Sequence, residues 1–312
     1  MLEAKTHKYL KEFLKKNPSN WRHSYSFGRI IASFLRNEEN LLINSEILLT
    51  REWFPGILLS LFLNQENSKF VLPSYQIQFL LNEHLPLYKE LGFNFSVKNN
   101  QIIFSNHTIF IHTIDSLIDD YSQSNFDKQY IVFADLERLK RDLKNFLKIT
   151  LYRKDWFNCD DSFLGDKDKL SNTYDLLKEK FFLRSIRNQT LMSLNIDESN
   201  LIKELIKQNS NYSDKFAKLN KAISSGWVFW INLDHDKFEW YLVVEPIDHF
   251  AEIKELLITN NLIFLSSLRK DNFFKRHLSK HNIKITSSIN FKSTFNEKNI
   301  IIYIPSKLLL PN

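Results

Sequence analysis

One carboxylate stands where a short apolar run ends. The run Ile131–Phe133 is followed by Ala134, Asp135 and Leu136. An acid at the carboxyl end of a buried strand can hold a divalent metal or polarise an attacking water. The same side chain can instead cap the basic helix that follows, because aspartate accepts hydrogen bonds from free N–H groups at a helix start. The sequence favours the cap and keeps Asp135 as a degenerate metal or water site in second place.

The segment after Leu41–Ile43 is the place to look for a phosphate-binding loop. Such a loop needs glycines, so that backbone N–H groups can surround the phosphates, together with a lysine and a Ser/Thr. Residues 44–51 contain no glycine, and no Gly-Lys pair occurs in the chain. Thr50 and Arg51 are therefore the candidates for a remnant phosphate contact, and an ordinary loop is the favoured alternative.

Polar residues in two short segments could donate hydrogen bonds to a nucleic-acid backbone. Ser74 and Gln76 follow the apolar run Phe70–Leu72, and Asn106 lies in a turn ahead of Ile109–Ile111. Hydroxyl and amide groups of this kind commonly contact phosphates. Each segment is short, so the prediction depends on their order along the chain.

Two basic segments give the strongest electrostatic signal. We predict a basic helix over residues 136–151, with basic residues 138–154 as the part that contacts DNA. We predict a second basic helix over 269–284, in which Phe273 and Phe274 accompany the cations. Cations with a stacking aromatic suit single-stranded nucleic acid. Ordinary solvated faces and core phenylalanines remain the alternatives. The candidate contacts are Lys140, Arg141, Lys144, Lys270, Lys275 and Arg276.

Short apolar runs alternate with helical patterns over the first 135 residues, which predicts an α/β fold with a mostly parallel sheet flanked by helices. Helical patterns fill residues 138–225, and strands return from Gly226, with a hairpin near Asp234–Lys237. We therefore expect a first part over 1–137, a helical insertion over 138–225 and a second part over 226–312.

Composition narrows the class of protein further. The net charge is +6 and the pI about 9.1, a mild indication of a polyanionic partner. A single cysteine excludes an internal disulfide and a cysteine-ligated cluster. The sequence has no apolar run long enough for a membrane span and no secretory signal, so we expect no membrane association and a cytoplasmic location.

The segment from Trp227 to Asn312 resembles the end of the first motor lobe of DinG-type superfamily 2 DNA helicases. The matching positions are Pro246-Ile247-Asp248, Ser266-Ser267-Leu268, Phe291 with Phe295, Tyr303-Ile304-Pro305 and Leu310-Pro311-Asn312. With the strand-end segments above, the resemblance covers nearly the whole chain and is weakest over 150–225. It implies a RecA-like fold of the P-loop NTPase type, in a degenerate first lobe that ends at Asn312, where the family's second motor lobe would begin.

The chain departs from the helicase pattern where ATP chemistry resides. The phosphate loop lacks glycine and Ala134 replaces the family's first acid, so ATP hydrolysis is not expected. We predict a helicase-related protein that binds DNA, with single strands preferred, and no cofactor. One alternative is the N-terminal part of an active helicase, which would use ATP and magnesium. The other is a protein-interaction module, with Leu308–Leu310 as a contact surface.

Overall fold

The computed structural model describes residues 1–21, 23–123, 128–157, 167–185, 189–211, 213–267 and 272–291. They form two compact units. The first contains residues 1–139 and the described residues from 254 onward, and the second contains residues 140–253. The tail motifs after Phe291, as well as Leu268 and Lys270, lie outside the described residues.

An eight-stranded sheet organises the first unit, in the order β12-β1-β11-β6-β2-β5-β4-β3. The six strands from β12 to β5 run parallel, and β4 and β3 form an antiparallel hairpin on the β5 side. This confirms the predicted mostly parallel sheet. The strands are β1 (Leu41–Asn44), β2 (Ser68–Val71), β3 (Ser96–Lys98), β4 (Gln101–Ile103), β5 (Thr108–His112), β6 (Tyr130–Phe133), β11 (Asn261–Ser266) and β12 (Ser287–Asn290).

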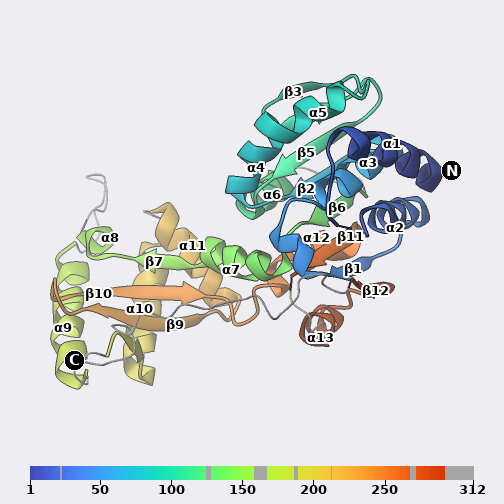
Figure 1. Ribbon diagram of the computed structural model, residues 1–312. Coiled ribbons are helices and arrows are strands. Elements are labelled where there is room, and N and C mark those ends of the chain that lie inside the picture. Colours follow the sequence, from blue (N-terminus) through green and yellow to red (C-terminus); the bar gives the residue numbers. More distant parts are fainter. Residues whose placement is uncertain are drawn as a thin grey trace, which may run out of the picture. The chain divides into compact units, whose positions relative to one another are not determined.

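Helices flank this sheet (Figure 1). They are α1 (Leu2–Lys16), α2 (Ser24–Asn37), α3 (Phe54–Asn64), α4 (Ser74–Phe79), α5 (Leu85–Lys89), α6 (Ile114–Gln123), α12 (Lys254–Thr259) and α13 (Asn272–Lys280), with a 3-10 turn η1 (Glu46–Leu49) and a π-helical turn η2 (Leu80–His84) between α4 and α5. Helix α3 is apolar on all sides, so nearly all of it is buried. A Cβ on Gly56 would lie 2.6 Å from Phe27 and 3.3 Å from the Cα of Gly28, so glycine is required where α3 packs on α2.

A four-stranded antiparallel sheet in the order β7-β10-β9-β8 organises the second unit. Its strands are β7 (Ile149–Leu151), β8 (Leu191–Ser193), β9 (Val228–Asp234) and β10 (Glu239–Glu245), and its helices are α8 (Arg153–Phe157), α9 (Lys167–Arg184), α10 (Ile196–Asn209) and α11 (Asp214–Ser224), with the 3-10 turn η3 (Ala251–Ile253) at its end. Trp240 anchors the core. Its indole N–H donates to the carbonyl of Tyr174 at 3.1 Å, and the two rings stack 4.8 Å apart.

Two boundaries differ from the sequence expectation. Helix α7 (Leu136–Leu147) ends before Lys148, because Ile149–Leu151 pairs with β10 as a strand. The predicted hairpin does form as β9 and β10, but it pairs with β7 and β8 and not with the first sheet. The inserted unit therefore runs from residue 140 to residue 253 and does not end at 225. It contains strands as well as helices.

Candidate nucleic-acid interface

Six parallel strands place their carboxyl ends at one edge of the first sheet. From β1 the chain continues to β2 on one side, whereas from β11 it continues to β12 on the other side of β1. Ligands of open α/β sheets bind outside the strand ends where the direction of connection reverses. The residues that follow β1, β2, β6 and β11 therefore define the candidate site.

The end of β1 is filled by packed side chains. Trp53 and Phe54 are fully buried, and their rings stack 4.3 Å apart. The indole N–H of Trp53 donates to the carbonyl of Thr50 at 2.8 Å, and the hydroxyl of Thr50 accepts the N–H of Glu52 at 3.3 Å. Thr50 thus helps to hold a turn, as the ordinary-loop alternative predicts.

Arg51 lies among aromatic rings. Its guanidinium carbon is 3.5 Å from the centroid of the Phe79 ring. Burial, and then the charge of Arg51, lower the pKa of His84 to about 4. The next residue, Glu52, accepts hydrogen bonds from the Ser19 hydroxyl at 2.5 Å and from the Trp21 N–H at 2.9 Å. Both side chains are thus engaged within the protein, Glu52 by hydrogen bonds to Ser19 and Trp21 and Arg51 by stacking on Phe79.

Asp135 caps helix α7. Its carboxylate accepts the N–H of Arg138 at 2.9 Å, the arrangement expected at a helix start. Burial raises the pKa of the Asp135 carboxyl; the bond from Arg138 lowers it in part, and the neighbouring Glu137 raises it further. Ala134 is buried and carries no ligand atom. The geometry is that of a cap, as the sequence favoured.

Glu137 connects the ends of β6 and β11. Its carboxylate accepts hydrogen bonds from the hydroxyl of Ser266 and from the backbone N–H of Ser267 at 3.3 Å. The sequence analysis matched Ser266 and Ser267 to the family but did not single out Glu137. Its signal was an acid in the first turn of a largely basic helix.

The end of β2 presents an exposed aromatic ring. Tyr75 is 52% exposed, and the guanidinium carbon of Arg138 lies 5.0 Å from its ring centroid. Ser74 beside it is exposed. Gln76, the other predicted donor, is buried, and its amide donates to the Tyr75 hydroxyl at 3.2 Å, so it does not offer an exposed amide to a phosphate. Gln76 orients the ring instead.

Asn106 lies at the opposite edge of the sheet from Ser74. It belongs to the turn between the antiparallel strands β4 and β5, and therefore sits where β5 begins, whereas Ser74 sits where the parallel strand β2 ends. Its side-chain oxygen lies 3.0 Å from Nδ1 of His107. The structure does not bring Asn106 together with the other predicted donors.

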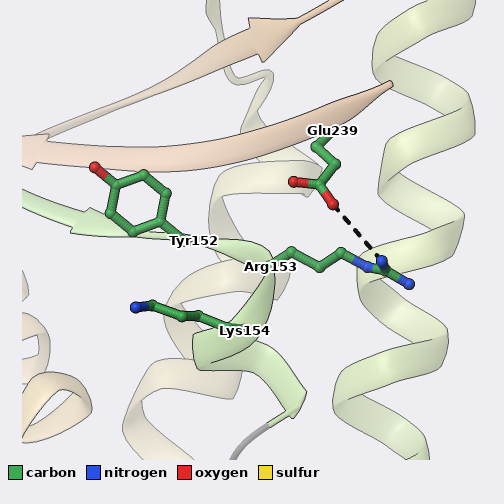
Figure 2. Close-up of a pocket in the computed structure, with 4 residues that line it drawn as sticks. All are labelled: Tyr152, Arg153, Lys154 and Glu239. Atoms are coloured by element: carbon green, nitrogen blue, oxygen red, sulfur yellow. Dashed lines mark ion pairs between the residues drawn. The ribbon is translucent and has the colours of Figure 1, made fainter. Parts of the chain in front are cut away.

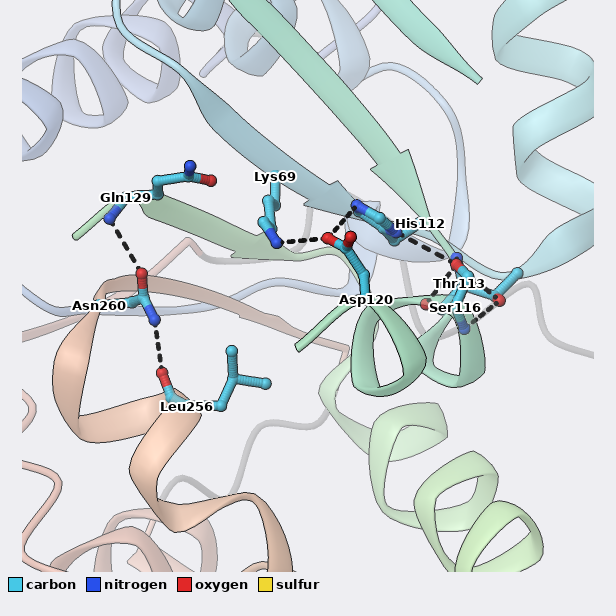
Figure 3. Close-up of polar contacts among 8 residues, drawn as sticks. All are labelled: Lys69, His112, Thr113, Ser116, Asp120, Gln129, Leu256 and Asn260. Atoms are coloured by element: carbon cyan, nitrogen blue, oxygen red, sulfur yellow. Dashed lines mark hydrogen bonds and ion pairs between the residues drawn. The ribbon is translucent and has the colours of Figure 1, made fainter. Parts of the chain in front are cut away.

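Thr113 and Ser116 occupy the shared edge, after β5 (Figure 3). Their hydroxyls and N–H groups bond reciprocally at 3.0–3.3 Å, which starts helix α6. Nearby, Lys69 of β2 is 2% exposed and pairs with Asp120 of α6 at 2.7 Å (Figure 3). Burial lowers the pKa of Lys69, and the contact with Asp120 opposes that shift. This ion pair ties α6 to the sheet.

The basic helices are only partly available to a ligand. Lys140, Arg141 and Lys144 are exposed on α7, but Lys144 pairs with the buried Glu245 at 3.2 Å. On α13, Arg276 is exposed and Lys275 half-buried, whereas Phe274 is buried and serves as a core anchor.

Comparison with known proteins identifies the fold. No protein-family model and no curated protein matches the sequence. The solved structure of S. tokodaii Xpd4 is similar over 88% of this chain and 61% of that chain, with 13% identity and a TM-score of 0.54. An apo XPD structure gives 85% and 57% coverage, 14% identity and a TM-score of 0.46. An XPD helicase structure gives 88% and 62%, 12% identity and 0.48.

The likeness to S. tokodaii Xpd4 and the mostly parallel sheet make the first unit a RecA-like α/β unit, as predicted. The chain spans about three fifths of the length of the solved structures it matches. At 12–14% identity the likeness concerns the fold alone. Among the described residues, no helix is long and apolar enough to cross a membrane.

Proposed function

We propose that this chain is a helicase-related protein that binds single-stranded DNA and does not hydrolyse ATP. The observation that carries the proposal is the contrast along one RecA-like sheet edge: packed aromatics after β1, and an exposed tyrosine beside an arginine after β2. The resemblance of the sequence to the first lobe of DinG-type helicases supports the choice of DNA.

Tyr75 and Arg138 supply the two interactions that a single strand needs. A base stacks on an exposed aromatic face with little regard to sequence, and a guanidinium binds phosphate. Ser74 adds a hydroxyl donor beside them, and Lys140 and Arg141 are exposed cations later on α7. The expected complex is therefore sequence-tolerant and salt-sensitive.

The test is fluorescence anisotropy of labelled single- and double-stranded DNA at several salt concentrations, with and without ATP-magnesium. We expect single-strand binding that weakens steeply with salt and ignores ATP. Reversing the charges of Lys275 and Arg276 should lower the affinity and the salt dependence, whereas reversing Lys8 and Lys11 on α1 provides a charge-matched control. Binding that responds to ATP would favour the active-helicase alternative.

An exposed apolar surface on the second unit favours a second candidate, protein interaction. Leu183 is 88% exposed, Ile196 79% and Leu191 59%, and Leu183 lines a cavity of about 570 Å³ between α9 and α10. Exposed apolar side chains that gather in one place commonly mark interaction sites. Absence of DNA binding at low salt would move the proposal to this function.

A further inference from the structure

The second unit contains an open cavity of about 500 Å³ that the proposed DNA contacts do not use. It is lined by Tyr152, Arg153, Lys154 and Glu239. Figure 2 shows the first three at the junction of β7 and α8, facing the start of β10, which carries Glu239. All four residues belong to residues 140–253.

Tyr152 forms a supported aromatic platform. It is 46% exposed, its ring centroid lies 5.3 Å from that of Tyr241, and Nζ of Lys215 is 5.4 Å from the centroid. Asp155 holds this arrangement, because its carboxylate accepts the N–H of Tyr152 at 2.7 Å and pairs with Lys215 at 2.6 Å. An aromatic ring fixed in this way loses little conformational entropy when a ligand stacks on it.

The charges in the cavity are divided between its two sides. Arg153 reaches toward Glu239, with 3.6 Å between nitrogen and oxygen, whereas Tyr152 and Lys154 extend in the other direction (Figure 2). In the part of the chain that the structure describes, no acid is paired with Lys154. Glu239 disfavours an anion near Arg153, so an anion is directed to Lys154.

We propose that this cavity binds one nucleotide unit, with the base stacked on Tyr152 and the phosphate bound by Lys154. For a nucleotide within a strand, the inference rests on the proposed DNA-binding function and adds a second contact outside the RecA-like sheet. A free nucleoside monophosphate offers the same chemistry, a planar base joined to a phosphate. The experiment distinguishes the two sources.

The experiment is photocross-linking of the full chain to an oligothymidylate that carries 5-iododeoxyuridine, followed by trypsin and mass spectrometry. Cleavage after Lys148 and Arg153 releases Ile149–Arg153, the peptide that contains Tyr152. We expect a cross-link to Tyr152 in this peptide. A cross-link within Phe70–Lys89, which contains Tyr75, reports the first unit separately.

Variants then test the roles of the ring and the charge. We expect Tyr152→Leu to abolish the Ile149–Arg153 cross-link and to weaken binding of the labelled oligonucleotide about tenfold, while Tyr152→Phe retains both. Lys154→Glu should weaken binding and reduce the salt slope by about one. Lys218→Glu, on the exposed face of α11, is the charge-matched control and should have a smaller effect.

Titration with thymidine monophosphate, and with inorganic phosphate as the base-free probe, separates the sources. If millimolar thymidine monophosphate does not compete with the oligothymidylate, the site binds a nucleotide within a strand. If it competes, and the competition requires Tyr152, the site binds a free nucleotide. DNA binding without the cross-link at 149–153, with Lys154→Glu equal to Lys218→Glu and with no monophosphate binding that requires Tyr152, would overturn the inference alone. Loss of DNA binding with retained monophosphate binding would overturn the proposed function alone, and loss of both would overturn both.

Discussion

Aromatic side chains are buried at one part of the sheet edge and exposed at another. After β1, Trp53 and Phe54 are fully buried and stacked, and Glu52 binds the segment around Ser19 and Trp21. After β2, Tyr75 is 52% exposed beside Arg138. The strands at both places are buried and parallel, so the sheet alone does not decide what its edge can bind. The residues immediately after each strand decide it.

The largest effect is expected at the buried half of this edge. Trp53→Ala removes a fully buried ring and its hydrogen bond to Thr50, and should lower the free energy of unfolding by about 3–5 kcal/mol. Urea denaturation measures this change. Tyr75→Ala, at the exposed half, should change stability far less. Equal losses in the two variants would contradict the contrast.

The stability of the fold should also depend on pH, because of His84 beside Arg51. The folded chain keeps His84 neutral down to its pKa of about 4, whereas the unfolded chain protonates it near 6.5, so between these values the unfolded state binds more protons. Stability should therefore fall as pH drops from 6.5 toward 4, with His84 contributing on the order of 2–3 kcal/mol. Denaturation of His84→Phe at each pH should show a shallower fall. An unchanged slope would place His84 in contact with solvent.

The exposed half should govern DNA affinity. Tyr75→Ala removes the stacking surface and should cost about 1–3 kcal/mol of binding free energy, while Tyr75→Phe retains most of it. Arg138→Gln should reduce affinity less and should lower its salt dependence. Anisotropy with labelled oligothymidylate measures all three variants. Full affinity in Tyr75→Ala would move the DNA site away from this edge.

The smallest effect is expected at Asp135. As a helix cap, Asp135→Ala should lower stability by about 1 kcal/mol, and Asp135→Asn should restore most of the loss, because the amide oxygen can still accept the N–H of Arg138. Thermal denaturation distinguishes the two variants. A loss of DNA affinity in Asp135→Asn at unchanged stability would assign the carboxylate a direct role in binding.

The sequence predicted the strands of the first sheet well, because continuous apolar runs are typical of buried parallel strands. It failed at Ile149–Leu151, where helical spacing of Leu143, Leu147 and Leu151 continued into residues that pair with β10. Tertiary pairing decided that segment, and a one-dimensional pattern cannot report a partner more than 90 residues away.

The site was predicted less completely. Ser74 and Gln76 were both named as donors, but a polar residue type does not reveal exposure, and only Ser74 is exposed whereas Gln76 is buried. Asn106 was separated from Ser74 by the antiparallel direction of β4, which the apolar runs do not encode. Tyr75 was missed because an aromatic residue after a strand is more often part of the core.

Thermal unfolding of the same protein with each ligand tests the central claim most directly. Oligothymidylate at about 100 times its dissociation constant should stabilise the fold by about 2.7 kcal/mol, and ATP-magnesium should leave the unfolding temperature unchanged. That result would support an edge that is closed to nucleotide after β1 and open to a single strand after β2. Stabilisation by ATP-magnesium, with none from the oligonucleotide, would contradict the account.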